Sequence, residues 1–209
     1  VYWRLHAAHG PQHWWPGDSA FEIMVGAVLT QNTAWTNVEK AIANLKTAKA
    51  LSPETIAATP HRRLAAWLKP SGYFNIKAKR LRSMCAWLIH KGGTRKIARL
   101  PTGALRAELL QVHGIGPETA DDILLYAFKR PVFVIDAYTR RLFQRLGLIQ
   151  GDEGYETLRS FFEKSLATDT QLFNEYHALI VVHTKDVCRK RPLCGACKLG
   201  PLCPSREFC

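Results

Sequence analysis

Residues 109–121 read LLQVHGIGPETAD. The pattern is typical of an apolar helix, a tight Gly-x-Gly turn and a second helix that begins directly after Gly116. Gly114 and Gly116 permit positive φ angles and leave the N–H groups of the turn uncovered. Because the positive end of the second helix dipole points to the same place, backbone donors converge on a site that suits a phosphate. An ordinary connection between two helices is the alternative for a Gly-x-Gly pattern that stands alone.

The charge balance favours the phosphate interpretation. The chain has 209 residues, with 29 Lys and Arg against 17 Asp and Glu, and a net charge of +12. Such an excess is typical of proteins that bind nucleic acid, so the turn is predicted to be a helix-hairpin-helix that binds the DNA backbone. The residues expected at the phosphates are His113, Gly114, Ile115, Gly116 and Thr119. Four basic residues at 77, 79, 80 and 82 and the basic run 189–191 are expected to widen this footprint; the four are Lys77, Lys79, Arg80 and Arg82.

Composition and apolar patterning exclude several classes of protein. Hydrophobic residues make up 47% of the chain, enough for a packed core and too many for a disordered chain. The longest apolar runs, such as 23–29 and 178–182, are far shorter than the roughly 20 residues that cross a bilayer, so no membrane partner is expected. The first residues carry no secretion signal. We therefore expect an intracellular protein, in the cytoplasm or nucleoid.

Helical periodicity runs through nearly the whole sequence. A capping box precedes residues 23–29, which are apolar on all sides and are therefore expected at the centre of a core. Only residues 131–135 look extended, and they are too few to build a sheet. The predicted fold class is all-α, with two helical lobes. Residues 20–132 would form a helical body with the hairpin, and residues 1–19 and 133–209 would form the second lobe.

Four of the six cysteines lie close together near the end of the sequence. Cys188, Cys194, Cys197 and Cys203 have the spacing C-x5-C-x2-C-x5-C. Four thiols in one short loop indicate one soft metal centre rather than a disulfide framework. Zinc and a [4Fe-4S] cluster both fit, but zinc sites more often show two close pairs separated by a longer arm, so the spacing favours the cluster. Loop 188–203 has few large apolar residues and is expected to be held in shape by the metal.

Together these features resemble the endonuclease III superfamily of DNA glycosylases. The hairpin, the four-cysteine loop and Asp136, which follows Glu118 by 18 residues, carry this resemblance. The segments WWP at 14–16, LTQNT at 29–33 and PSGYFNIKAKRL at 70–81 look most like the bacterial 3-methyladenine DNA glycosylase III branch. Two departures stand out. That branch lacks the four-cysteine loop, and endonuclease III commonly has six residues, not five, in the first cysteine gap.

The resemblance implies hydrolysis without a covalent enzyme–sugar step. Endonuclease III has a catalytic lysine where this chain has Glu118, and an amine is needed to form a Schiff base with the sugar. The chain is therefore expected to lack lyase activity. Asp136 matches the carboxylate shared across the superfamily, which would stabilise the oxocarbenium-like sugar and orient or deprotonate the attacking water. The alternative role of Asp136 is to cap the helix that begins at Ala137.

The resemblance also implies that a base is extruded from the duplex and that side chains fill the space it leaves. Gln31 and Asn32 match the polar wedge of the superfamily, and Asn32 aligns better with the endonuclease III wedge. Tyr73 lies where a second wedge would enter. The alternative for these residues is a capped loop at a helix end.

Aromatic residues are expected to form the pocket for the extruded base. The cage would comprise Trp14, Trp15, Pro16 and Trp35, and Glu118 would also contact the substrate. A purine alkylated at N3 is cationic, so indole faces would add cation–π attraction of about 1–2 kcal/mol for each good contact. The alternative is ordinary packing, which is the assignment for Trp3, Trp67 and Trp87.

The resemblance therefore implies a monofunctional DNA glycosylase of base excision repair, active as a monomer on double-stranded DNA that contains damaged bases. It would remove alkylated purines of the 3-methyladenine type and leave an abasic site. The alternatives are a mismatch or oxidised-base glycosylase, acting on thymine or uracil, adenine or oxidised pyrimidines, and a non-catalytic Fe–S DNA-binding module.

Overall fold

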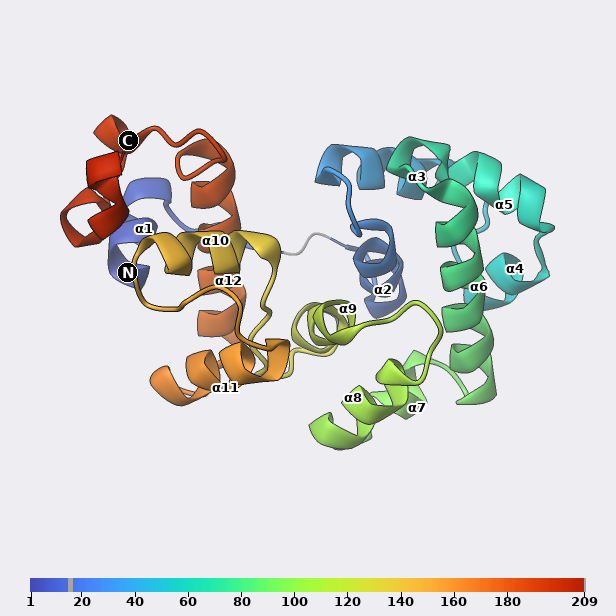
Figure 1. Cartoon of the computed structure of the whole chain (residues 1–209). Helices are drawn as coiled ribbons and strands as arrows, with labels where there is room; N and C mark the ends of the chain where they lie inside the picture. Colours follow the sequence, from blue (N-terminus) through green and yellow to red (C-terminus); the bar gives the residue numbers. More distant parts are fainter. Residues whose placement is uncertain (15–16, 209) are drawn as a thin grey trace. The chain divides into compact units, whose positions relative to one another are not determined.

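The protein is all-α, as the sequence predicts. The computed structural model describes residues 1–14 and 17–208, and within these ranges it contains helices and connecting loops but no strand. The chain divides into a central unit, residues 15–130, and a terminal unit built from residues 1–14 and 131–209 (Figure 1). The boundaries predicted from the sequence are at residues 20 and 132. No helix in the described part of the chain combines the length and hydropathy that a bilayer crossing requires.

The central unit contains most of the helices. They are α2 (Ala20–Leu29), α3 (Trp35–Thr47), α4 (Pro53–Ala58), α5 (His61–Leu68), η1 (Lys69–Ser71), α6 (Phe74–His90), α7 (Thr94–Ile97), α8 (Thr102–Leu110), α9 (Pro117–Asp122) and η2 (Ile123–Ala127). η1 is a 3-10 turn, and η2 is a π-helical continuation of α9.

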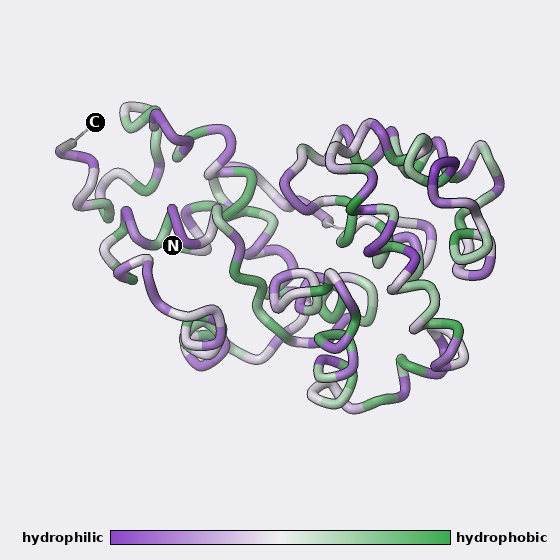
Figure 2. The backbone as a smooth tube through the Cα atoms, turned by 45° about the vertical axis from the view of Figure 1, so that its right-hand side comes forward, coloured by the Kyte–Doolittle hydropathy of each residue, from purple (hydrophilic) through white to green (hydrophobic). Residues whose placement is uncertain are grey.

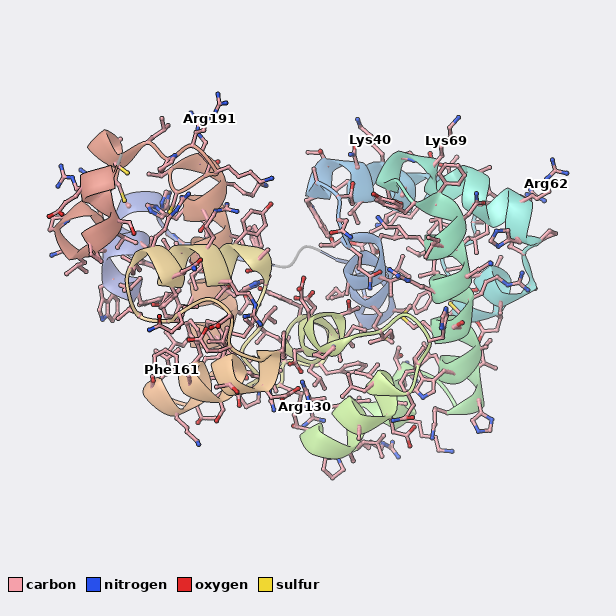
Figure 3. The ribbon with its side chains drawn as sticks, viewed as in Figure 1. Lys40, Arg62, Lys69, Arg130, Phe161 and Arg191 are labelled. Carbon is pink, nitrogen blue, oxygen red and sulfur yellow. The ribbon has the colours of Figure 1, made fainter. Side chains whose placement is uncertain are left out.

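Helix α2 is the centre of this unit. The Ser19 hydroxyl accepts a hydrogen bond from the Glu22 N–H at 3.2 Å, which caps the helix where the sequence predicts. Every residue from Phe21 to Leu29 is buried, and α2 packs against α3, α6, α9 and η2. The more superficial helices are amphipathic, and hydrophobic and hydrophilic residues alternate along them (Figure 2). Basic side chains such as Lys40 and Arg62 point outward from the central unit (Figure 3).

The terminal unit joins the two ends of the sequence. Its helices are α1 (Tyr2–His9), α10 (Ala137–Arg145), α11 (Tyr155–Ser165), α12 (Thr170–Asp186) and the 3-10 turns η3 (Cys194–Ala196), η4 (Gly200–Leu202) and η5 (Pro204–Phe208). Helix α12 packs against both α1 and α10. Phe133 stacks on Phe162 with ring centroids 4.4 Å apart and meets Phe173 edge-on at 5.5 Å.

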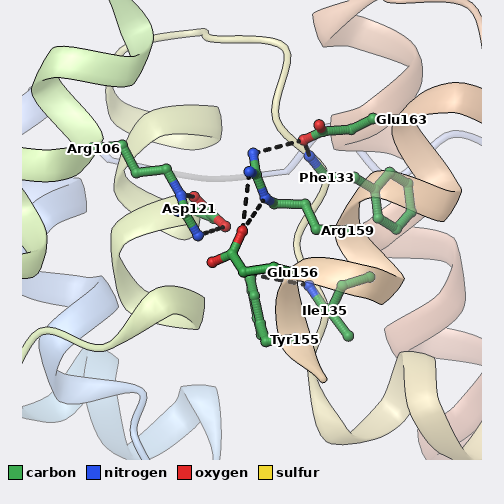
Figure 4. A network of polar contacts seen from close by, with 8 residues as sticks. All are labelled: Arg106, Asp121, Phe133, Ile135, Tyr155, Glu156, Arg159 and Glu163. Carbon is green, nitrogen blue, oxygen red and sulfur yellow. Dashed lines mark hydrogen bonds and ion pairs between the residues drawn. The ribbon is translucent and has the colours of Figure 1, made fainter. Parts of the chain in front are cut away.

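The segment 131–136 is neither helix nor strand. The Phe133 N–H donates to Glu163 Oε1 at 3.0 Å, and the same carboxylate oxygen accepts from Arg159 at 3.2 Å (Figure 4). Side chains of α11 therefore supply the acceptors that a neighbouring strand would supply in a sheet.

One core assignment is wrong. Trp3 is 77% exposed, because α1 buries only Leu5 fully. Trp67 and Trp87 are half-buried.

Candidate functional site

The predicted hairpin is formed by α8 and α9. The buried side chains of Val112 and Ile115 anchor the turn, and the Ile115 N–H donates to the Val112 carbonyl at 3.0 Å. Gly114 has φ +89°, and a Cβ there would lie 2.2 Å from Arg80 Cγ, so only glycine fits. A Cβ on Gly116 would meet no described atom within 4 Å. The turn is therefore covered at its first glycine and open at its second, where α9 begins.

A buried ion pair joins the two arms of the hairpin. Arg106 on α8 donates from Nε and Nη2 to the two carboxylate oxygens of Asp121 on α9, at 2.7 and 3.1 Å (Figure 4). The Asp121 side chain is fully buried and that of Arg106 is 13% exposed. This bidentate geometry fixes the angle between the arms.

The hairpin residues expected to contact phosphates differ in their exposure to solvent. His113 and Gly116 are exposed, and Gly114 is half-buried. Ile115 and Thr119 are buried, so their side chains serve the interior and only their main-chain groups can contact a ligand.

The side-chain amide of Gln31 forms its hydrogen bonds within the protein, mainly with the hairpin. Its Nε2 donates to the Gly114 carbonyl at 3.1 Å and to Thr119 Oγ1 at 2.9 Å. Its Oε1 accepts a hydrogen bond from the Arg80 guanidinium. The amide therefore links α6 to the hairpin, and both of its polar atoms are used.

The other two candidate wedge residues are exposed and have unusual backbone angles. Asn32 has φ +54° and Tyr73 has φ +44°, both in the left-handed region that non-glycine residues rarely adopt. The Tyr73 side chain is 68% exposed. Each residue is the tip of a short loop, the first after α2 and the second after η1.

Lys77 is not a surface residue, which corrects the expectation that it contacts phosphates. It is 1% exposed, and its Nζ donates to the Leu29 carbonyl at 2.9 Å and to the Ser71 carbonyl at 2.6 Å. Burial, and to a lesser degree the charge of Arg80, lower the pKa of Lys77 to about 8. Arg80 is only half-buried, and it lies against Gly114 and Gln31.

Asp136 lies in the terminal unit and caps α10. Its Oδ1 accepts a hydrogen bond from the Thr139 N–H at 2.7 Å, so the capping role considered in the sequence analysis is confirmed. The other oxygen, Oδ2, lies 3.6 Å from His177 Nε2 on α12, an ion-pair separation slightly longer than a direct hydrogen bond. The carboxylate is 12% exposed.

The surroundings of Asp136 favour its ionised form. Burial alone would raise the pKa, but the His177 imidazole and the Thr139 N–H outweigh it and lower the pKa of Asp136 below its ordinary value. A partly buried, ionised carboxylate at the start of a helix can stabilise a neighbouring positive charge. Capping uses only one of its oxygens.

The residues of the predicted aromatic cage are divided between the two units in the sequence, and two of them lie outside the described residues. Trp15 and Pro16 fall in the undescribed gap. Trp14 is half-buried in the terminal unit. Trp35 opens α3 in the central unit, where its Nε1 donates to Glu39 Oε1 at 3.0 Å. Glu118 is exposed in the first turn of α9. The cage stays a prediction.

The cysteine loop surrounds a cavity of about 340 Å³, and all four predicted ligands, Cys188, Cys194, Cys197 and Cys203, line it. Arg145 Nη1 lies 3.3 Å from Cys188 Sγ. Among the described residues no three His, Cys, Asp or Glu side chains are arranged to coordinate one metal ion, and Cys194 is in a disulfide. Thiols gathered at one cavity are nevertheless the donor set of zinc and Fe–S sites, so the residues fit such a group chemically once Cys194 is reduced.

A second, basic depression of about 630 Å³ lies in the terminal unit. It is lined by Tyr138, Arg141, Thr184, Lys185, Arg189, Lys190 and Arg191. Arg191 points outward (Figure 3). The guanidinium of Arg141 lies over the Tyr138 ring, 5.3 Å from its centroid. The first residue that lines it, Tyr138, follows Asp136 by two residues in the sequence. Its arginine and lysine side chains make the depression suitable for an anionic partner.

Sequence reasoning missed two residues of these sites. His177 approaches Asp136 from a helix 41 residues further along the chain, and nothing in the local sequence marks it. Arg145 donates to the Cys188, Arg189 and Lys190 carbonyls, and so supports the cysteine loop from α10. Its place in the last turn of a predicted helix gave no signal of this role.

Comparisons with known proteins identify the family of the chain. Residues 25–168 match the family described as "HhH-GPD superfamily base excision DNA repair protein". The "Putative DNA repair glycosylase MJ1434" of Methanocaldococcus jannaschii is 45% identical over 212 aligned positions, which cover 100% of this chain and 94% of that protein.

Two solved structures are also similar. A Helicobacter pylori 3-methyladenine DNA glycosylase bound to 1,N6-ethenoadenine is 33% identical with a TM-score of 0.74, covering 87% of this chain and 91% of that one. A non-covalent endonuclease III–DNA complex has a TM-score of 0.84 at 23% identity, covering 98% and 92% of the two chains, which shows the same fold. The chain therefore belongs to the HhH-GPD superfamily of base excision DNA repair proteins, as a DNA repair glycosylase.

Proposed function

We propose that the protein is a monofunctional glycosylase that removes alkylated purines of the 3-methyladenine type from double-stranded DNA. The observation that carries the proposal is Asp136, whose carboxylate is held ionised by His177 and Thr139 at the start of α10. The substrate class is supported by the similarity to the 3-methyladenine glycosylase, which was solved with a modified adenine.

The chemistry follows from the charge of Asp136. As the base leaves, positive charge develops on the sugar, and a fixed carboxylate stabilises that charge and orients the attacking water. Alkylation makes the purine a better leaving group, so a strong general acid is not required. Glu118 occupies the first turn of α9 and has no amine with which to form a Schiff base. The reaction therefore ends at an abasic site without strand cleavage.

The loops of the central unit would replace the extruded base. Asn32 and Tyr73 are exposed at loop tips, whereas Gln31 has both polar atoms engaged by the hairpin and Arg80. We therefore assign insertion to Asn32 and Tyr73 and a supporting role to Gln31. The open hairpin turn at Gly116 and the basic depression at Arg189–191 would hold the DNA backbone.

Cys188, Cys194, Cys197 and Cys203 would hold a [4Fe-4S] cluster. Such a cluster supplies four strong bonds that fix a loop with few large apolar residues. Its role here would be structural. By fixing the loop, the cluster would position the basic run 189–191, which lines the depression. Iron and sulfide analysis with a visible spectrum tests this assignment, and a colourless protein that contains stoichiometric zinc would overturn it.

The experiment for the function is base release from defined duplexes. The protein is incubated with separate duplexes that contain 3-methyladenine, 7-methylguanine, T opposite G, A opposite 8-oxoguanine or thymine glycol, and released bases are identified by chromatography. Release of alkylated purines alone supports the proposal. Release of only oxidised pyrimidines or mismatched bases ends the alkylpurine assignment, and no release from any duplex favours a non-catalytic DNA-binding module. Borohydride should trap no covalent protein–DNA adduct.

A further inference from the structure

Lys77 is among the largest fully buried side chains of the described residues, and it carries an amino group. Its Nζ donates to the carbonyl of Leu29, the last residue of α2, and to the carbonyl of Ser71, the last residue of η1. Carbonyl groups at a helix end lack partners within the helix, and a cation there is favourable. One side chain of α6 therefore joins the ends of two other elements.

The two carbonyls stand directly before the two candidate insertion loops. Asn32 follows Leu29 by three residues, and Tyr73 follows Ser71 by two. Asn32, Gly72 and Tyr73 all have φ between +44° and +68°. Backbone in this region persists where the surroundings impose it. The loops thus begin at points fixed by the Lys77 amino group and then adopt strained conformations that expose their tips.

A second contact from the same face of α6 reaches the hairpin. Arg80, three residues after Lys77, donates to Gln31, and Gln31 donates to Gly114 and Thr119. Residues three apart on a helix lie side by side. Lys77 and Arg80 therefore connect both loops and the hairpin turn through one helix face, which α2 and η1 also contact.

Packing alone does not explain an amino group at this position. A methionine would fill a similar volume without the cost of burying an amine, and that cost is visible in the lowered pKa of Lys77. The geometry explains why an amino group is present. An apolar side chain cannot donate hydrogen bonds to two carbonyls that belong to separate elements.

We propose that Lys77 is a positioning residue that holds the Asn32 and Tyr73 loops at a fixed separation, so that both tips enter the DNA duplex together when a base is extruded. The inference rests on the proposed function, since it concerns how that function's insertion loops are held. Lys77 itself touches neither the base nor the DNA backbone in this role.

The test uses Lys77→Met, with Lys40→Met as the matched control that removes an exposed lysine of α3. Insertion is measured without any bond cleavage, by the fluorescence of 2-aminopurine placed opposite a tetrahydrofuran abasic-site analogue. Excision of 3-methyladenine is then measured on two duplexes. In the paired duplex the damaged base has its normal partner. In the gapped duplex it lies opposite the abasic-site analogue, so its extrusion needs less help from the loops. All assays are run at a temperature at which melting curves show each variant to be folded.

The expected result is a selective loss. Lys77→Met should lose the insertion signal and should lose about ten- to a hundredfold in excision from the paired duplex, as expected for displaced positioning groups. It should lose much less on the gapped duplex and keep wild-type affinity for undamaged DNA. Lys40→Met should behave as wild type in all of these assays.

Three results would overturn the inference. A normal insertion signal in folded Lys77→Met would show that the loops do not need the amino group. Equal losses on the paired and gapped duplexes would show a general structural role. Absence of the insertion signal in the wild-type protein would overturn the inference alone, because the proposed function is decided by base release from the wild-type protein. If Lys77→Met does not fold, Lys77→Gln replaces it, because its shorter amide keeps a polar group but cannot span both carbonyls, and the same outcomes apply.

Discussion

Asp136 serves two roles that two substitutions can separate. In the wild-type protein the Thr139 N–H donates to Asp136 Oδ1 at 2.7 Å. Asp136→Asn keeps an oxygen that can accept this hydrogen bond, and Asn caps helices about as well as Asp. Asp136→Ala removes the cap and should cost about 1 kcal/mol of the free energy of unfolding, which lowers Tm by about 2–4 °C in a chain of this size. Both substitutions remove the charge that faces the developing sugar cation, so both should reduce single-turnover excision by about 10²–10³-fold or more.

The assay is base release from an alkylated duplex with enzyme in excess, alongside thermal unfolding and DNA binding. Excision by Asp136→Asn within tenfold of wild type would refute the catalytic role, whereas an unchanged Tm in Asp136→Ala would refute only the capping role.

The pKa of Asp136 lies below its ordinary value. The stability that its ionised form contributes is therefore present above the unfolded-state pKa, about 3.9, and is lost only as pH falls through the lower folded-state pKa. Asp136→Asn should not show this acid loss.

Four further predictions concern the central unit. Gly114→Ala should lower the free energy of unfolding by more than about 1 kcal/mol, because its φ is +89° and its Cβ would meet an arginine side chain. Gly116→Ala should change stability by less than about 0.5 kcal/mol yet weaken DNA binding in a salt titration, and unchanged binding would contradict the phosphate role of the turn. Arg106→Met should cost about 3–5 kcal/mol in chemical denaturation, because it leaves the buried Asp121 carboxylate without its bidentate partner; a loss below 1 kcal/mol would show that this pair does not brace the hairpin. The pKa of Lys77 is lowered from 10.5 to about 8, so between these pH values the unfolded chain holds a proton that the folded chain has released. Wild type should therefore gain stability relative to Lys77→Met as pH rises through this window, and parallel stability curves would contradict the lowered pKa.

Local patterns predicted the helices, their caps and the hairpin. The capping box at Ser19, the glycine turn and the cap at Asp136 all depend on neighbours within four residues, so one short stretch of sequence contains each of them. The contact of Asp136 with His177 joins separate helices and left no local signal.

Lys77 shows a different limit of sequence reasoning. It precedes Leu81 by four residues and therefore lies on the apolar stripe of α6, whereas its neighbour Ile76 is 49% exposed. Residue type favoured a surface lysine and spacing favoured a buried one. The spacing was the better guide, because two carbonyls at the ends of other elements make a buried amino group tolerable. Those partners become visible only once the elements are packed.

The joining of both chain ends in the terminal unit has a consequence for biosynthesis. Helix α1 is synthesised before the central unit, yet it packs against α12, whose residues 170–186 are synthesised after that unit. Residues 15–130 can meanwhile collapse on α2 as a unit, since domains generally fold in the order of synthesis. The nascent protein should therefore acquire a protease-resistant fragment from residues 15–130 before α1 is protected. Ribosome-bound chains that stop only after residue 130 has left the exit tunnel should already contain that fragment.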